Sequence, residues 1–246
     1  MDGIYYIATG PRHVAEAIRA AQSAREWMEA YPIALFTDQE VDHPVFDRVL
    51  RCSYPSNSYV DKIEGMLACP FDRAIFLDTD THICGSIKGL FDLLTRFDLA
   101  VAHSSWRFSP PLVDGSVSDG AYIGYSCPTS FCELNTGVLT FTNSPQVRGF
   151  FRYWLATFRE QTRQSDAQPW HDQPSFRVAL WHSSIRAYIL PTEFNYRADF
   201  PGAVGTAVRI VHGRHPRLAE IGRRLNEGAG ARVFVPGEFK MFEWQE

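Results

Sequence analysis

The sequence predicts an α/β protein built on one open, mostly parallel twisted sheet that is flanked by helices. Short apolar runs that end in polar or turn-forming residues alternate along the chain with longer segments of helical periodicity. Several of the short runs are apolar at every position, as expected for parallel strands that are buried on both faces. In such folds, ligands bind at the carboxyl ends of the strands.

The first hundred residues show this alternation most clearly. The first strand is followed by Thr9, the second by Asp38 and the third by Asp78, so these polar residues should lie at one edge of the sheet. The expected strands are residues 4–8, 33–36, 74–77 and 99–102, and the expected helices are residues 14–28 and 60–69.

The second part of the chain continues the pattern less regularly. From Gln146 onward, apolar residues recur with the spacing of an amphipathic helix. Residues 103–126 are rich in Ser, Gly, Pro and Tyr and have neither period, which predicts a long irregular loop of the kind that often has a function. Further strands are expected at 137–141, 208–211 and 232–235, and further helices at 174–180 and 218–225.

Composition excludes several classes of protein. The chain has 246 residues, of which 45% are hydrophobic, so it can form a packed core. Its net charge of -4 argues against a nucleic-acid partner. The five cysteines are scattered without a CxxC pair, which fits a reducing compartment. Neither a signal peptide nor an apolar stretch of roughly twenty residues is present, so we expect a cytoplasmic protein without a transmembrane segment.

Asp78 and Asp80 are the strongest candidates for a metal site. They are separated only by Thr79 and follow a buried strand, so both carboxylates should leave the sheet beside the ligand crevice. Two carboxylates this close repel each other unless a cation neutralises them. Mn²⁺ or Mg²⁺, which prefers oxygen ligands and often binds substrate phosphates, would do so. The alternative is an ordinary turn in which Asp78 caps a backbone amide and Asp80 is solvated.

The segment FDRAIFLDTDTHI, residues 71–83, resembles the DxD region of GT-A-fold glycosyltransferases. The resemblance is to family 8 in particular, the group of glycogenin and bacterial lipooligosaccharide galactosyltransferases. Four other features follow the family's order along the chain. They are Lys62, the LNTGVLTF strand at residues 134–141, the sequence His171-Asp172-Gln173, and the strand end Ile210-Val211-His212-Gly213.

This resemblance implies a single domain that spans residues 1–246. Its nucleotide-binding half would be about residues 1–100, and its sugar and acceptor half, with a smaller acceptor-side subregion, about residues 101–246. The implied activity is transfer of a hexose-type sugar, with retention, from a nucleotide-diphosphate sugar to a glycan or other hydroxyl acceptor, and the resemblance favours UDP as the nucleotide.

The resemblance also assigns residues to roles. Asp78, Asp80 and His212 would bind the metal ion, and Lys62 and Thr79 would lie near the nucleotide and its diphosphate. Thr9 and Asp38 would also lie near the nucleotide, because they follow strands at the ligand-binding edge of the sheet. Asn135, Gly137, Asp172 and Gln173 would surround the sugar, with Lys62, Asp172 and Gln173 taking part in the reaction. If the enzyme inverts configuration instead, Asp172 is the candidate general base.

One motif departs from the family. The family usually has Gly-x-x-Lys-Pro-Trp after its metal histidine, with the lysine on the donor phosphate, whereas this chain has Gly213-Arg214-His215-Pro216-Arg217. Arg214 or Arg217 could supply the missing cation, because a guanidinium binds phosphate bidentately. The basic residues between Arg209 and Arg224 could also meet an anionic membrane surface, although a solvated helix face is the simpler interpretation.

Each of these residues also has a simpler interpretation. Lys62 could be a solvated surface charge, Asp172 could be the N-cap of the following helix, and His212 could be structural. For the whole chain, two other functions fit the same features. One is a nucleotidyltransferase that makes sugar nucleotides, although residues 9–12 lack the glycine-rich loop that is usual there. The other is a catalytically silent module that binds a nucleotide-sugar or a glycan.

Overall fold

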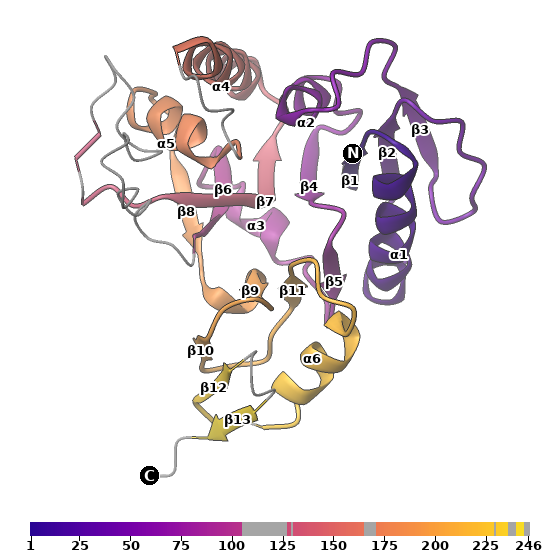
Figure 1. The fold of residues 1–246 in the computed structure, drawn as a ribbon, viewed down its shortest axis with the longest axis vertical. Coiled ribbons are helices and arrows are strands. Elements are labelled where there is room, and N and C mark those ends of the chain that lie inside the picture. The colour runs from indigo at the N-terminus through magenta and orange to yellow at the C-terminus, as the bar shows by residue number, and fades with distance from the viewer. Residues whose placement is uncertain (105–126, 129, 165–170, 229, 236–239, 244–246) are drawn as a thin grey trace.

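Figure 1 shows the computed structural model of the chain, which describes residues 1–104, 127–128, 130–164, 171–228, 230–235 and 240–243. A seven-stranded sheet forms its centre, with the spatial order β3-β2-β1-β4-β7-β6-β8. Its strands are β1 (Asp2–Ala8), β2 (Ile33–Thr37), β3 (Arg48–Arg51), β4 (Arg73–Leu77), β6 (Leu99–His103), β7 (Leu134–Thr142) and β8 (Ala187–Leu190).

Among the described strands of this sheet, β7 alone is antiparallel to its neighbours. It runs opposite to both of its neighbours, β4 and β6, whereas every other neighbouring pair is parallel. The expectation of a mostly parallel sheet is therefore confirmed. Because β7 is reversed, its first residues lie at the same edge as the last residues of β4. Leu77 pairs with Val138, and the backbone N–H of Asp78 donates to the carbonyl of Gly137 at 2.8 Å.

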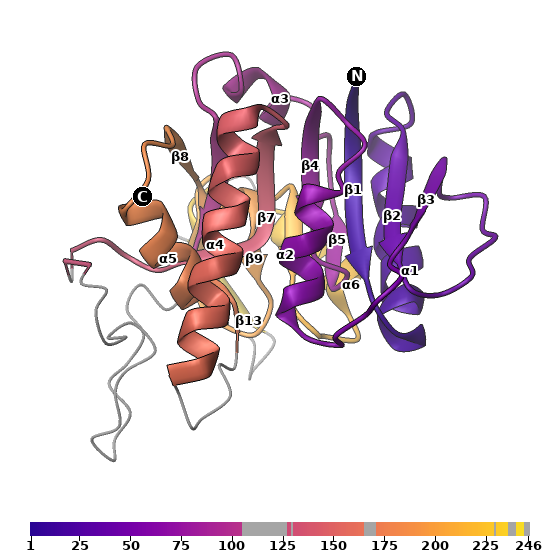
Figure 2. The same ribbon diagram turned by 90° about the horizontal axis from the view of Figure 1, so that it is seen from above.

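Helices cover both faces of the central sheet (Figure 2). Helices α1 (Pro11–Trp27) and α3 (Leu90–Leu93) share one core, and α2 (Tyr59–Leu67), α4 (Pro145–Gln164) and α5 (Gln173–Trp181) share the other. Successive residues of β1 point to opposite faces, so Tyr6 enters the α1 core and Tyr5 enters the α2 and α4 core. This two-sided burial explains why the strand has apolar residues at consecutive positions.

Helix α4 fixes the start of α5, which belongs to the site described below. Trp154, buried in the core, donates its indole N–H to Ser175 Oγ at 2.9 Å. Ser175 Oγ in turn donates to the carbonyl of Asp172 at 2.7 Å. Helix α4, which its amphipathic pattern predicted, therefore also helps to position Asp172 just before α5.

A smaller part of the molecule, formed by the C-terminal residues together with β5, carries two three-stranded sheets. One has the order β5-β11-β9 and the other β10-β12-β13, and α6 packs beside them on a separate small core that includes Tyr196, Val211 and Phe234. Strand β11 pairs with β5, placing His212 opposite Thr81. The elements are β5 (Thr81–Ile83), η1 (Thr192–Phe194), β9 (Tyr196–Arg197), β10 (Gly202–Val204), β11 (Ile210–His212), α6 (Leu218–Leu225), β12 (Arg232–Val235) and β13 (Lys240–Glu243).

Most expected elements are present within a few residues of their predicted bounds. Helix α3 and the short strands β3, β5, β8, β9, β10 and β13 had no clear sequence signal. The expected irregular loop at 103–126 falls outside the described residues from 105 onward. Within the described part of the chain, no helix has both the length and the apolar character needed to cross a membrane.

Candidate metal centre and adjoining pocket

A pocket of about 650 Å³ opens where β1 and β4 end, and its lining includes all but two of the predicted site residues. The two that do not line it are Asp38 and Gly137, of which Gly137 donates its backbone N–H to Asn135 Oδ1 in the lining. The predicted residues in the lining are Thr9, Lys62, Asp78, Thr79, Asp80, Asn135, Asp172, Gln173, His212 and Arg214.

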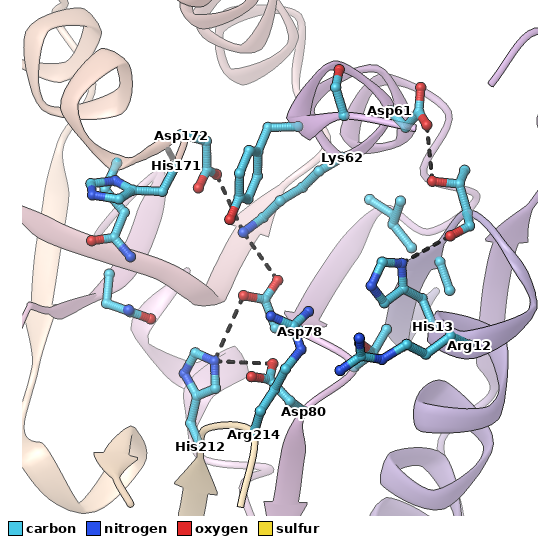
Figure 3. Close-up of a pocket in the computed structure, with 18 of the residues that line it drawn as sticks. Arg12, His13, Asp61, Lys62, Asp78, Asp80, His171, Asp172, His212 and Arg214 are labelled. Atoms are coloured by element: carbon cyan, nitrogen blue, oxygen red, sulfur yellow. Dashed lines mark hydrogen bonds and ion pairs between the residues drawn. The ribbon is translucent and has the colours of Figure 1, made fainter. Parts of the chain in front are cut away.

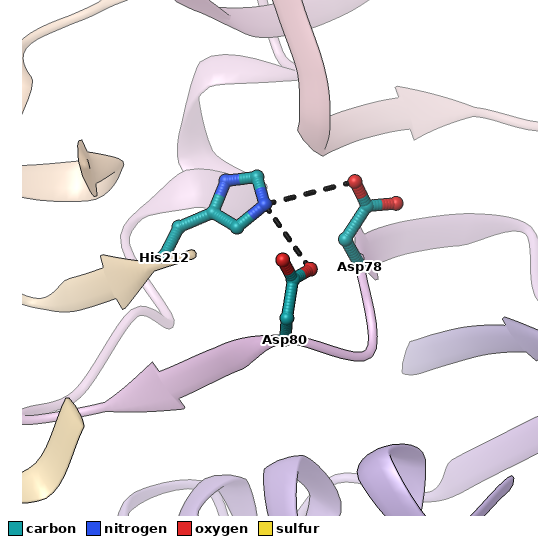
Figure 4. A group of neighbouring side chains, drawn as sticks. All are labelled: Asp78, Asp80 and His212. Atoms are coloured by element: carbon teal, nitrogen blue, oxygen red, sulfur yellow. Dashed lines mark ion pairs between the residues drawn. The ribbon is translucent and has the colours of Figure 1, made fainter. Parts of the chain in front are cut away.

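Three side chains from two segments of the chain form a candidate metal centre (Figure 4). Asp78 directly follows β4, Asp80 directly precedes β5, and His212 ends β11. The His212 Nε2 atom lies 3.3 Å from Asp80 Oδ1 and 3.7 Å from Asp78 Oδ2. One ligand atom from each residue lies within 4.8 Å of the others, so the group could hold a metal ion. Two carboxylates and an imidazole suit a divalent cation such as Mn²⁺.

Asn195 supports the imidazole from the other side. Its Oδ1 lies 2.8 Å from His212 Nδ1, and both residues are 2% exposed. With the carbonyl oxygen as acceptor, Nδ1 carries a proton, so Nε2, which faces the two carboxylates, is the nitrogen that would bind a cation. Histidines that bind metals are usually oriented by such a contact. Asn195 follows η1 and had no signal in the sequence, because only the fold brings it to His212.

Gly137 leaves the space that this centre needs. A Cβ atom at this position would lie 2.2 Å from His212 Cε1 and 2.8 Å from Asp78 Oδ2. The resemblance placed Gly137 beside the sugar, and the structure places it against two of the candidate metal ligands.

The pKa of Asp80 reflects the charged groups around it. Burial opposes ionisation of Asp80, but the neighbouring His212 and Arg214 outweigh it and lower the pKa of this carboxyl.

Lys62 joins the metal centre to Asp172 (Figure 3). Its Nζ lies 3.0 Å from Asp78 Oδ1 and 3.3 Å from Asp172 Oδ2, and it donates to Thr136 Oγ1 at 3.1 Å. The side chain is only 11% exposed, so Lys62 is not a solvated surface charge. Burial opposes the charged form, but Asp172 and Asp78 outweigh it and raise the pKa of Lys62. Lys62 is therefore a buried cation shared between two carboxylates.

Asp172 stands at the N-cap position of α5 but does not act as a cap. Its side chain makes no capping hydrogen bond. The carboxylate instead accepts a hydrogen bond from Thr136 Oγ1 at 2.8 Å and pairs with Lys62. The N-cap interpretation is therefore correct for the position and wrong for the side chain, which faces the pocket. Thr136, which connects Lys62 and Asp172, was not singled out from the sequence.

At the other end of the pocket, two aspartates shape the segment after β1. Thr9 Oγ1 donates to Asp61 Oδ2 at 2.9 Å, and the same oxygen accepts from the backbone N–H of Asn57 at 2.9 Å. Asp38 accepts from the backbone N–H of Gly10 at 2.8 Å. Burial opposes ionisation of Asp38, but the Gly10 N–H outweighs it and lowers the pKa. Asp38 thus supports the turn after β1 rather than lining the pocket.

The structure places the two arginines that could replace the family's phosphate-binding lysine in different surroundings. Arg214 lines the pocket, and its Nε lies 3.8 Å from Glu16 Oε1. Arg217 precedes α6 and pairs with Glu220, also at 3.8 Å. Of the two, Arg214 is therefore the one placed to meet a ligand beside Asp80.

Comparison with models of known protein families and with curated proteins finds no match to this chain. The chemistry and the geometry of these side chains are therefore the basis for a functional proposal.

Proposed function

We propose that this chain is a metal-dependent glycosyltransferase that transfers a hexose-type sugar from a nucleoside-diphosphate sugar to a hydroxyl acceptor. One observation carries the proposal. The candidate metal ligands Asp78, Asp80 and His212 share a pocket with the ion-paired Lys62 and Asp172, although these residues come from distant parts of the chain. Their order and types resemble those of family 8 of the GT-A-fold glycosyltransferases.

In this proposal, different residues contact different parts of the substrate. A Mn²⁺ or Mg²⁺ ion held by Asp78, Asp80 and His212 would offset the negative charge that grows on the diphosphate leaving group. Lys62 holds Asp172 in place, and Asn135 and Gln173, which line the pocket, can donate hydrogen bonds to sugar hydroxyls and accept them. The preference for UDP and the retention of anomeric configuration are implied by the resemblance alone.

The proposal is tested by incubating the full chain with a panel of nucleotide-sugars, with and without Mn²⁺, and measuring release of the nucleoside diphosphate. We expect Mn²⁺-dependent release from at least one donor. Asp80→Ala should abolish it without unfolding the protein, whereas Asp42→Ala, at an exposed carboxylate, should have no effect. Donor binding without hydrolysis or transfer would favour a silent binding module. Formation of a nucleotide-sugar from a nucleoside triphosphate and a sugar 1-phosphate would favour a nucleotidyltransferase.

Stereochemistry has its own readout. NMR of the first-formed product distinguishes the two outcomes, because a β-linkage from an α-linked donor would exclude retention. Asp172 would then be the residue to test as general base, since its carboxylate lies in the pocket.

A further inference from the structure

Glu16 brings together three segments beside the metal centre. Its carboxylate accepts a hydrogen bond from Thr79 Oγ1 at 3.1 Å. Glu16 Oε1 also lies 3.3 Å from Arg12 Nε and 3.8 Å from Arg214 Nε. Arg12 comes from α1 and Arg214 from the segment that follows β11, as Figure 3 shows. One carboxylate is thus the common partner of two arginines that are far apart in the sequence.

The burial of these groups is unequal. The side chain of Glu16 is 12% exposed, whereas those of Arg12 and Arg214 are 75% and 54% exposed. Exposed ion pairs contribute little to stability, so either arginine can exchange its partner at small cost. The carboxylate is held more firmly, because it is largely buried and accepts a hydrogen bond from Thr79, which lies between Asp78 and Asp80 in the sequence.

Both arginines also stand at a boundary between two cavities. They line the large pocket and a second, adjoining pocket of about 440 Å³, and Thr79 and Asp80 line both as well. The guanidinium groups are therefore next to the candidate metal centre. Since both Nε atoms are close to the same oxygen, the two groups are near enough to bind one anion together.

We propose that Arg12 and Arg214 form a two-armed clamp for the diphosphate of the donor, and that Glu16 occupies this clamp when no ligand is bound. The inference rests on the proposed function and adds Arg12 and Glu16 to its site. When the diphosphate binds, phosphate oxygens replace the Glu16 carboxylate as the acceptors for the guanidinium N–H groups. Arginine suits this role because its planar donors match phosphate bidentately.

A simpler interpretation is that Arg12 and Glu16 are an ordinary pair one turn apart on a helix. Such pairs form between exposed side chains and need no third partner. Here the carboxylate is largely buried, accepts a hydrogen bond from Thr79 and also faces Arg214 from another segment. These contacts direct Glu16 toward the metal centre rather than along the surface of α1.

Titration calorimetry of the full chain with Mn²⁺ tests the clamp. UDP, GDP, ADP and CDP are the probes, and the nucleoside diphosphate that binds most tightly is compared with its monophosphate. Arg12→Ala and Arg214→Ala should each weaken diphosphate binding about tenfold and monophosphate binding less than about threefold, because the clamp requires two phosphates. Glu16→Gln should strengthen diphosphate binding about threefold or more, because a competing negative charge is removed. Arg96→Ala, at an exposed arginine after α3, is the matched control.

The possible results separate the two proposals. If the protein binds a nucleoside diphosphate and Arg12→Ala leaves that affinity unchanged, the clamp is wrong and the glycosyltransferase proposal stands. An equal loss for diphosphate and monophosphate would mean that Arg12 does not recognise the diphosphate, which also overturns the clamp. Weaker binding by Glu16→Gln would show that Glu16 does not compete with the ligand. If none of the four diphosphates binds in the presence of Mn²⁺, both proposals fail.

Discussion

The Oδ1 atom of Asn195 lies 2.8 Å from Nδ1 of His212, with both side chains buried. A carbonyl acceptor at Nδ1 leaves Nε2 as the nitrogen that can bind a metal ion, and Nε2 is the atom that faces Asp78 and Asp80. The fold therefore orients the imidazole so that Nε2 could act as a metal ligand. This contact makes the three candidate ligands more than a chance group of polar side chains.

Removing the acceptor should weaken metal binding. We expect Asn195→Ala to lower the affinity for Mn²⁺ by about 10- to 100-fold, because the imidazole loses the contact that fixes its proton and its orientation. Asn195→Asp, which keeps an acceptor oxygen, should stay close to the wild type. Electron paramagnetic resonance of free Mn²⁺ measures both affinities. If Asn195→Asp binds as weakly as Asn195→Ala, the amide N–H rather than the carbonyl oxygen faces His212.

Two glycine-to-alanine variants separate an effect on the metal centre from a general effect on the fold. Gly137→Ala places a methyl group against His212 and Asp78, so at least one ligand must move and we expect Mn²⁺ binding to be lost. Gly149→Ala meets no atom within 4 Å and lies inside α4. It should raise the free energy of unfolding by about 1 kcal/mol and leave Mn²⁺ binding unchanged. Normal Mn²⁺ affinity in Gly137→Ala would contradict the proposed ligand set.

Sequence patterns could predict the position of the site residues that lie at strand ends. A strand buried on both faces must end near the first polar side chain, and this located Asp78 and Thr9 at one edge of the sheet. The amphipathic period likewise located α4. In contrast, β3 has the sequence RVLR and is largely exposed at the edge of the sheet. It therefore shows neither the apolar run of a buried strand nor the period of an amphipathic helix.

The contacts that complete the site depend on the tertiary fold. Thr136, Glu16 and Asn195 are ordinary polar residues in the sequence, and each gains its role from a partner many residues away. Lys62 was ambiguous for the same reason, since a lysine on a helix is usually solvated. Only the antiparallel placement of β7 beside β4 brings Thr136 between Lys62 and Asp172.

Asp98 provides a test of stability against pH. Its carboxylate accepts hydrogen bonds from the backbone N–H of Arg186 at 2.9 Å and from the guanidinium at 2.8 Å. These contacts with Arg186 lower the pKa of Asp98. The stabilisation is therefore fully present above the usual aspartate pKa of about 3.9 and is lost as the pH falls through the lowered value.

We therefore expect Asp98→Asn to be less stable than the wild type at pH 7 and to lose less stability on acidification below about pH 4. Urea unfolding at a series of pH values measures both effects. Asp42→Asn, at an exposed carboxylate, should retain the wild-type dependence on pH. An unchanged acid slope in Asp98→Asn would show that the contact with Arg186 does not contribute to acid stability.

Lys62 should stabilise the fold as well as take part in the proposed reaction. Lys62→Met leaves the buried Asp172 carboxylate without its cation, so we expect the free energy of unfolding to fall by about 3 kcal/mol. Adding Asp172→Asn removes the unpaired charge and should recover part of this loss, whereas turnover should remain low in both proteins. Chemical denaturation of the wild type, the two single variants and the double variant gives the coupling energy between the residues.

The coupling energy distinguishes charge pairing from packing at this position. Lys62 Nζ also lies 5.4 Å from the centroid of the Phe76 ring, so the side chain has a second stabilising contact that Asp172→Asn does not affect. If the two substitutions are additive, that contact and the burial of the aliphatic stem account for the stability. A coupling of about 1 kcal/mol or more would instead assign it to the ion pair. In that case the cation that links the metal centre to Asp172 also stabilises the fold around the pocket.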